Sequence, residues 1–352
     1  MRILTFIQAK LQHLNAGYFA LVMATGALSI SLHLMGWNVM SLCLFYLNIS
    51  FYIVLALFTV IRLIFFTREL IYDLTSHWHG PNFFTLIAGT NIVGSECIFL
   101  QGNIDVAITL WVISILFWFL IMYTFFTAVT IRSDKPTLAQ GIHGGWLIAV
   151  VATQSIAVLG ALLIPYIEND ALLSSVYFTS LVMYLLGCML YLSLITLILY
   201  RLIFASLSYH ALTPLYWINM GAMAISTLAG SIMIMRASYW DWMNELLPFL
   251  KGITLFFWVA GSWWIPLLII LMIWRYVIHR YPFMYDLKMW GMVFPLAMYS
   301  ASTYQLAKAL HLPFLTKLAQ AFVYPALICW GIGIILFVSH MALDYHKFNY
   351  SS

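Results

Sequence analysis

The chain is organised as ten long runs of apolar residues separated by short polar connectors. About 20 apolar residues are enough to span the hydrocarbon core of a bilayer as a helix. The runs lie near residues 17–36, 42–66, 81–100, 105–130, 145–165, 173–204, 212–235, 250–276, 289–309 and 317–342. We therefore predict an all-α integral membrane protein with ten transmembrane helices, in which residues 1–352 form a single domain with short termini.

The ten runs alternate between two compositions. In 20-residue windows, the odd-numbered runs hold 8 to 10 Gly, Ala, Ser, Thr and Asn residues, whereas the even-numbered runs hold 4 or 5. Small residues let helix backbones approach closely, and large aliphatic and aromatic side chains suit a surface that faces lipid. We predict that the odd helices lie inside, around a central pore, and that the even helices lie outside and face lipid. The alternative is that the inner helices pack shut as a structural core.

An odd run followed by an even run makes a helical hairpin, and this unit recurs five times. Thr25, Thr90, Thr153, Ala224 and Ala301 follow one another at separations of 65, 63, 71 and 77 residues. An aromatic residue stands seven positions before each of them, namely Tyr18, Phe83, Trp146, Trp217 and Phe294. Because a hairpin returns to the side on which it began, the repeats are parallel and related by an axis along the membrane normal.

Composition and charge agree with a membrane location and indicate an orientation. The chain is 64% hydrophobic and only 7% charged, whereas soluble domains carry about 25% charged residues. The net charge of +4 is modest and gives no reason to expect a nucleic-acid partner. With the N-terminus inside, eleven Lys and Arg residues fall on the cytoplasmic side and four on the outer side, as basic residues prefer. We predict a protein of the inner or plasma membrane with both termini cytoplasmic.

Ionisable residues are nearly absent from the middle of the runs. Glu96 and Lys308 lie towards the outer ends of their helices, and we predict them at the pore mouth. A coupled carrier normally needs an ionisable group within the membrane, whereas a weakly polar wall lets ions leave as readily as they enter. The candidate wall residues are Thr25, Ser29, Thr90, Asn91, Thr153 and Gly221. For each of these, the alternative is a polar or small side chain packed between helices.

The ninth run contains a Phe-Pro pair, Phe294 and Pro295. Proline removes a backbone donor and leaves the carbonyl of Gly291 without its usual partner, which is tolerated where backbone is buried in protein or lines a wet cavity. Phe294 shares a helix face with Met298 and Ala301, so it is the bulky residue on a face whose side chains become smaller along the helix. We predict that Phe294 is a gate positioned by Pro295 and that Met298 and Ala301 line the pore. Ordinary packing of the ring is the alternative.

The ten histidines suggest a competing class, a haem- or metal-bearing membrane enzyme. Such an enzyme would need facing histidine pairs inside the spans, but the histidines lie at, beyond or near the ends of the runs. No catalytic triad or nucleotide-binding motif occurs in a suitable context. We therefore predict that the chain is not an enzyme and holds no metal or cofactor, and absence of visible absorbance would exclude the redox alternative.

Three segments resemble a known family. AGYFALVMATGALSI (16–30), LFFWVAGSWWIPLL (255–268) and FPLAMYSASTYQLA (294–307) are similar to the tellurite-resistance/dicarboxylate transporter family, which includes yeast malate permease and the slow-type anion channels of plant guard cells. The resemblance implies five hairpins around a pore, a homotrimer with one pore per subunit, and anion conduction with Phe294 blocking the pore. The first motif often reads Gly-Tyr-Phe-Gly in relatives. Here it runs from Gly17 to Ala20, both predicted to line the pore, so a methyl group stands at the position that is often glycine.

The leading hypothesis is an anion channel or channel-like permease that passes small inorganic or carboxylate anions. The alternative on the same scaffold is a proton-coupled carrier of C4-dicarboxylates such as malate, or a tellurite-extrusion carrier. The scarcity of ionisable groups in the spans favours the channel, and Glu96 keeps the carrier open.

Overall fold

A computed structural model describes residues 10–350 of the chain. Its regular elements in that range are all helices, and no described residue lies in a β-strand. Nine described segments are long and apolar enough to cross a membrane. They are Ala16–Leu34, Asn38–Phe65, Gly80–Gln101, Ile104–Ile131, Gly144–Tyr166, Asp170–Phe204, Pro214–Met235, Trp242–Ile278 and Leu315–Lys347. The predicted class of an all-α, multi-pass membrane protein is therefore confirmed.

Two sets of helices differ in their burial. The core helices are α2 (Phe19–Leu34), α5 (Phe84–Glu96), α8 (Ile148–Leu163), α10 (Ile218–Met235) and α12 (Trp290–Ala309). The peripheral helices are α3 (Asn38–Phe65), α6 (Ile104–Ile131), α9 (Asp170–Phe204), α11 (Trp242–Ile273) and α13 (Leu315–Tyr350). The apolar windows of the first four core spans are 78, 83, 100 and 94% buried, whereas those of the peripheral spans are 17, 28, 44, 22 and 17% buried. The compositional alternation along the chain thus corresponds to an alternation of buried and exposed helices.

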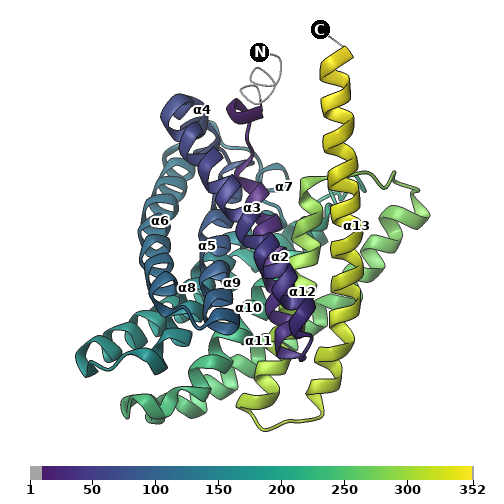
Figure 1. Cartoon of the computed structure of the whole chain (residues 1–352). Helices are drawn as coiled ribbons and strands as arrows, with labels where there is room; N and C mark the ends of the chain where they lie inside the picture. Colours follow the sequence, from purple (N-terminus) through teal and green to yellow (C-terminus); the bar gives the residue numbers. More distant parts are fainter. Residues whose placement is uncertain (1–9, 351–352) are drawn as a thin grey trace.

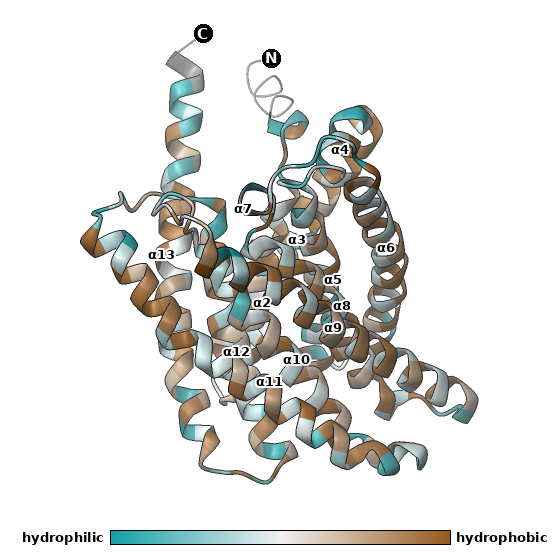
Figure 2. Ribbon diagram, turned by 180° about the vertical axis from the view of Figure 1, so that it is seen from behind, coloured by the Kyte–Doolittle hydropathy of each residue, from teal (hydrophilic) through white to brown (hydrophobic). Residues whose placement is uncertain are grey.

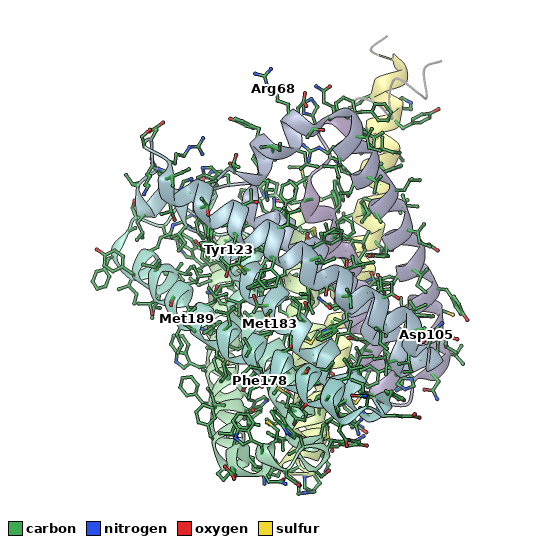
Figure 3. All side chains as sticks on the ribbon, turned by 90° about the vertical axis from the view of Figure 1, so that its left-hand side faces the viewer. Arg68, Asp105, Tyr123, Phe178, Met183 and Met189 are labelled. Atoms are coloured by element: carbon green, nitrogen blue, oxygen red, sulfur yellow. The ribbon has the colours of Figure 1, made fainter. Side chains whose placement is uncertain are left out.

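The exposed surface of the peripheral helices is mostly apolar. Hydrophobic residues run along these helices, and hydrophilic residues gather at helix ends and connectors (Figure 2). Tyr123 on α6 and Phe178 and Met189 on α9 lie on this surface, and the charged residues Arg68 and Asp105 lie at its edges (Figure 3). An apolar exterior on this scale is costly in water and favourable in lipid.

The core helices contact one another in cyclic order. Contacts join α2 to α5, α5 to α8, α8 to α10, α10 to α12, and α12 back to α2. Each core helix also contacts the peripheral helix that follows it. The five core helices therefore surround a common axis. The sequence repeats predict an arrangement of this kind.

Hydrogen bonds from aromatic side chains fasten the peripheral helices to the core helices. The indole nitrogens of Trp118, Trp258 and Trp330 donate to the hydroxyls of Thr153, Thr303 and Thr25 at 2.8, 3.0 and 3.0 Å. The bond between Trp330 on α13 and Thr25 on α2 joins the last helix of the chain to the first span. Because water is absent from the hydrocarbon region, a polar group there needs such an internal partner.

Asparagine and glycine residues define several helix ends. The side chains of Asn103 and Asn169 accept hydrogen bonds from the N–H groups of Val106 and Leu172 at the starts of α6 and α9. Gly102 ends the π-helical turn η3 (Cys97–Gln101) with a φ of 63°, a conformation that favours glycine. Short helices α4 (Thr67–Leu74) and α7 (Leu138–Gly141) occupy connectors on the side of the molecule where the described chain begins and ends (Figure 1).

Every core helix begins with a short 3-10 turn. These turns are η1 (Ala16–Tyr18), η2 (Gly80–Phe83), η4 (Gly144–Leu147), η6 (Pro214–Trp217) and η9 (Leu287–Met289). They contact one another in the same cyclic order as the helices that they begin. The first four repeat aromatics lie within these turns, whereas Phe294 is the fifth residue of α12. The seven-residue spacing therefore does not place Phe294 level with the other four aromatics, because the fifth repeat is shifted.

The segment predicted as the ninth span is α12, and it is not among the nine apolar spans. Seventeen of its 20 residues are buried. It contacts α2, α10 and α13, and its Thr303 hydroxyl accepts a hydrogen bond from Trp258 of α11. A helix enclosed by protein can carry hydroxyl groups and small residues where a lipid-exposed helix cannot. Its moderate hydropathy follows from this central position, and ten membrane-spanning helices remain a prediction.

Candidate functional site

A cavity of about 360 Å³, named here the entrance cavity, lies where the five core helices begin. Its lining residues are Asn15, Gly17, Ala20, Trp78, His79, Asn82, Thr85, His143, Ile148, Arg201, His210, Ala211, Thr213, Leu215, Asp286, Leu287 and Lys288. Residues from the first turns of all five core helices, or from the 3-10 turns before them, are in this set. The cavity is thus centred on the axis that the core helices share.

Side-chain hydrogen bonds hold the rim of the entrance cavity together. The Oδ1 atom of Asn15 accepts from the backbone N–H of Gly17 at 2.8 Å and from the Nδ2 atom of Asn82 at 3.0 Å. The hydroxyl of Thr85 donates to the carbonyl of Ala16 at 2.8 Å. These bonds join the starts of α2 and α5, so the two 3-10 turns form one rigid part of the rim.

The entrance cavity is electropositive. Arg201 and Lys288 line it together with one carboxylate, Asp286, which leaves one net positive charge among these three groups. The Asp286 carboxylate lies 3.8 Å from the Lys288 ammonium, and the buried Arg201 guanidinium donates to the Tyr216 hydroxyl. In addition, the N-terminus of each core helix contributes a partial positive charge of roughly half an elementary charge. Anions are therefore favoured in this cavity over cations.

The cavity-lining histidine His143 is held in its neutral form. Burial lowers its pKa to about 4, and the positive charges of Arg201 and Lys288 act in the same direction. Its Nδ1 atom accepts a hydrogen bond from the N–H of Gly145 at 3.1 Å, which only a neutral ring can do. The ring also stacks on Trp78 with centroids 5.5 Å apart. At neutral pH His143 therefore adds no positive charge to the cavity, whereas Arg201, Lys288 and the helix termini do.

Contacts on α12 define which of its faces point to other helices. Pro295 faces α10, Thr303 faces α11, and Ser300 bonds to Ser31 on α2 and to the carbonyl of Ala319 on α13. Because successive residues of a helix are about 100° apart, Pro295, Thr303 and Ser300 together mark the sides of α12 that face α10, α11, α13 and α2. The face that carries Phe294, Met298, Ala301 and Gln305 lies in the remaining sector, between α2 and α10.

Phe294 is 2% exposed, so its ring does not reach the outer surface of the molecule. Depth along each core helix can be counted from the end of its 3-10 turn. The lining residues of the entrance cavity that lie deepest by this count are Ala20 and Thr85, each the second residue of its helix. Phe294 is the fifth residue of α12. It therefore lies about one helical turn below the floor of the entrance cavity.

Pro295 fits against a glycine on the neighbouring helix. A β-carbon at Gly221 of α10 would lie 2.6 Å from the Cγ atom of Pro295 and 3.0 Å from its Cβ atom. Gly221 is thus required for close approach of α10 to the proline ring. α12 continues as one helix from Trp290 to Ala309 across Pro295.

The predicted wall residues are buried, and several of them bond to peripheral or neighbouring core helices. Thr25 accepts from Trp330 on α13, Thr153 accepts from Trp118 on α6, and the Thr90 hydroxyl lies 3.1 Å from the Tyr52 hydroxyl on α3. The structure therefore places these three threonines as links between helices. Gly17 and Ala20 line the entrance cavity, and Met298 and Ala301 share the face of Phe294.

Ser29 and Asn91 also bond to neighbouring helices. The Ser29 hydroxyl donates to the carbonyl of Ser41 on α3 at 2.9 Å. The Asn91 amide donates to Ser155 on α8 and accepts from Ser114 on α6, at 3.0 and 2.7 Å. Both side chains are fully buried.

The two residues predicted at the pore mouth have different surroundings. Glu96 is fully buried, and its Oε2 atom accepts from the Asn48 amide on α3 at 2.6 Å. Its Oε1 atom has no partner among the described residues. Lys308 is exposed at the opposite end of α12 from the entrance cavity, with its ammonium 4.6 Å from the centroid of the Tyr304 ring.

The charged and histidine residues of the entrance cavity were not singled out by the sequence. Arg201 lies near the end of α9, whereas Asp286 and Lys288 lie two positions apart just before α12, far along the chain from Arg201. Their common location at one end of the runs was the available signal, since basic residues and histidines gather at the ends that the sequence predicts to be cytoplasmic. Sequence spacing does not reveal that they surround one cavity. No group of three His, Cys, Asp or Glu suited to a metal occurs in the described part of the chain.

Comparison with known proteins gives similarities over the full bundle and over part of it. Residues 13–347 match the SLAC1 family model, described as voltage-dependent anion channel. An uncharacterized membrane protein of Mycobacterium tuberculosis is 34% identical over 165 residues, which are 46% of this chain and 82% of that protein. Two uncharacterized transporters of Methanocaldococcus jannaschii are 25 and 24% identical over 316 and 332 residues, covering 86 and 90% of this chain and 87 and 90% of theirs.

Proposed function

The chain belongs to the SLAC1 family of voltage-dependent anion channels, and from this premise we propose that it conducts small anions through the axis of its five core helices. The proposed cargo is small inorganic anions and carboxylates. Conduction is passive in this proposal. The axis carries a partial positive field at its entrance, and within the described part of the chain no core helix carries a buried Lys or Arg that would bind an anion tightly deeper in the bundle.

The observation that carries the proposal is the entrance cavity. One cavity touches the starts of all five core helices, so it lies on their common axis rather than between two neighbours. The helix N-termini, Arg201 and Lys288 raise the local concentration of anions there. A shut structural core would not need an electropositive cavity on its axis.

Phe294 is the proposed constriction. Its ring is buried on the face of α12 that lies in the sector between α2 and α10, about one turn below the floor of the entrance cavity. A hydrophobic ring at a narrow point stops ions by excluding the water that they need. Pro295, seated against Gly221, fixes the position of the turn that carries the ring.

The remaining architecture is proposed as follows. Residues 1–352 form one domain with ten membrane-spanning helices, paired as five hairpins, with the peripheral helices in lipid and both termini in the cytoplasm. The entrance cavity then opens on the cytoplasmic side of the inner or plasma membrane. Three copies are proposed to assemble with one pore in each subunit, as in the family that the sequence resembles.

The proposal is tested by reconstituting the purified chain and a Lys288→Glu variant in planar bilayers. In asymmetric chloride solutions, the reversal potential of the wild type should follow the chloride gradient. Lys288 is partly exposed at the cavity, so reversing its charge should lower anion current several-fold at low ionic strength. The difference should shrink near 1 M salt, where the Debye length is about 3 Å.

Lys135→Glu is the matched control, since Lys135 is an exposed residue on the same side that does not line the cavity. Its current should equal that of the wild type. A wild-type reversal potential that follows the cation gradient, or equal losses in the two variants, would reject the proposed conduction path.

A proton-coupled carrier is the second candidate, and Glu96 is the observation that favours it. Its carboxyl is fully buried in α5 with one oxygen lacking a described partner, which is costly for a group without a function. A carrier predicts that a pH gradient alone drives uptake of malate or tellurite into liposomes and that Glu96→Gln abolishes it. Uptake that is indifferent to the pH gradient excludes the carrier and leaves the channel.

A further inference from the structure

A second cavity of about 360 Å³, named here the tyrosine cavity, lies beside the entrance cavity. It is lined by residues of η1, η8 (Trp274–Ile278), the connector 279–286, η9 and α13. Six of its lining residues carry the argument, namely Tyr18, Arg275, Tyr276, Tyr281, Met284 and Tyr285. Four tyrosines and one arginine around a single cavity offer several hydrogen-bond donors and one positive charge. The lining also includes one carboxylate, Asp286, which lies 3.8 Å from the Lys288 ammonium and forms no ion pair with Arg275.

Arg275 is almost fully buried but has no ionic partner. Its side chain is 3% exposed, and no described carboxylate forms an ion pair with it. Its Nη1 atom donates to the carbonyl of Leu212 and, at 3.5 Å, to that of His210, and its Nε atom has no partner among the described residues. The guanidinium carbon lies 3.9 Å from the centroid of the Tyr281 ring and 5.2 Å from that of Tyr276. A buried positive charge without a counter-charge is destabilising, and the ring contacts compensate only part of that cost.

Arg62 shows how this protein satisfies a buried arginine elsewhere. It lies near the end of α3, as Arg275 lies at the end of the α11 span, and it is also 3% exposed. Its Nη1 atom donates to the carbonyl of Leu14, ahead of α2, and its Nη2 atom lies 2.6 Å from the Asp73 carboxylate. Arg275 makes the corresponding backbone contact to Leu212, ahead of α10, but has no aspartate. Where Arg62 has a carboxylate within ion-pair distance, Arg275 adjoins the tyrosine cavity and forms no ion pair with Asp286, the carboxylate that lines it.

We propose that the tyrosine cavity binds a phosphoryl group, with Arg275 supplying its counter-charge. The planar guanidinium presents paired donors that match phosphate oxygens, and tyrosine hydroxyls can donate to the remaining oxygens. The cavity is much larger than a single small ion, so it accommodates a substituted phosphate. Val277, Ile278 and Phe283, which are neighbours in the chain of lining residues, are exposed apolar residues at the end of a span, which suits a lipid headgroup as well as a soluble phosphate compound.

The site also adjoins the proposed conduction path. Leu287 of η9 lines both cavities, and α12 with Phe294 continues from that turn. An occupant would therefore contact the turn from which the gate helix starts. This link to gating rests on the proposed function, whereas binding of the phosphoryl group does not.

The test measures thermal unfolding of the full chain in a neutral detergent at constant ionic strength. The probes are inorganic phosphate, a short-chain phosphatidic acid and a short-chain phosphatidylcholine. Saturation at about a hundred times Kd should raise the unfolding temperature by about 5 °C. Arg275→Gln should lose this shift, although the variant also loses the bond to Leu212 and can fail to fold.

Met284→Glu keeps the test decisive if Arg275→Gln does not fold. It introduces a carboxylate on an exposed connector residue that lines the tyrosine cavity. That carboxylate should pair with Arg275 as Asp73 pairs with Arg62, and should abolish the shift produced by the phosphate probes. Phe283→Glu is the matched control, because Phe283 is the exposed neighbour that does not line the cavity.

The probes distinguish the sources of the phosphoryl group. A shift with both inorganic phosphate and phosphatidic acid supports a site for the phosphoryl group itself, and a shift with phosphatidic acid alone supports a lipid headgroup. No shift with either probe, or an equal loss in Met284→Glu and Phe283→Glu, overturns the proposal. Because unfolding temperature is measured without any ion flux, these outcomes are independent of the test of conduction.

Discussion

Replacing the ring of Phe294 with a methyl group (Phe294→Ala) should raise anion current about tenfold or more, equivalent to lowering the barrier by about 1.4 kcal/mol. The ring is the proposed hydrophobic constriction, and its removal lets water and ions occupy the axis below the entrance cavity. Single-channel or macroscopic current in planar bilayers, at matched protein density, measures the effect.

Phe257→Ala is the control that separates gating from general loosening. Phe257 on α11 is 1% exposed and packs edge-to-face on Tyr191 with centroids 5.8 Å apart. Truncating a ring in a packed core costs about 3–5 kcal/mol, so Phe257→Ala should unfold at a much lower temperature yet pass the wild-type current. Phe294→Ala should show the reverse balance, with a smaller loss of stability and a larger current. Equal currents in the two folded variants would remove Phe294 as the gate.

Gly221→Ala should destabilise the protein by about 1–3 kcal/mol, because a β-carbon there overlaps the ring of Pro295 and one helix must move. The overlap is with ring atoms at 2.6 and 3.0 Å, which cannot rotate away as a flexible side chain can. Since Pro295 adjoins Phe294, the displaced turn should also leak, and basal current should rise. Thermal unfolding in detergent and current in bilayers measure the two effects on the same preparation.

A double-mutant cycle assigns the cause to the Gly221–Pro295 contact. Pro295→Ala removes the Cγ atom, so it should restore part of the stability lost in Gly221→Ala, with a coupling of about 1 kcal/mol or more. Gly331→Ala is the matched control, since no atom lies within 4 Å of a β-carbon at Gly331 on peripheral helix α13. That change should be neutral or slightly stabilising, because alanine favours the helix. Additive effects in the cycle would show that the two residues do not depend on each other.

Sequence composition determined the class of the protein and the two kinds of helix. Bulky apolar side chains are favourable on a surface that faces lipid, and small ones allow helices to pack closely. Each environment therefore favours residue types that can be counted along the chain. The buried share of the apolar windows follows this count for α2, α5, α8 and α10 against the five peripheral helices. The Phe-Pro pair was also visible, because a proline removes a backbone donor and here follows a large ring on a face with small residues.

The repeat register was less visible. From the seven-residue spacing before Thr25, Thr90, Thr153, Ala224 and Ala301, Phe294 is expected at the same depth as Tyr18, Phe83, Trp146 and Trp217. In the structure, those four lie in 3-10 turns, and Phe294 lies inside α12. Helix starts depend on capping and on contacts with neighbouring turns, and a spacing along the chain does not record them.

Only the tertiary structure decided which side chains meet. Threonines at similar positions on the core helices can face the axis or a peripheral helix. Thr25 and Thr153 accept hydrogen bonds from the indoles of Trp330 and Trp118, which lie on peripheral helices. Gly221 and Pro295 are 74 positions apart (295 minus 221), and their contact depends on the approach of two whole helices. Residues along a helix report the medium that it faces, because that is a local property. The partner of a given side chain depends on rotation and depth of both helices, which the packing of the complete bundle sets.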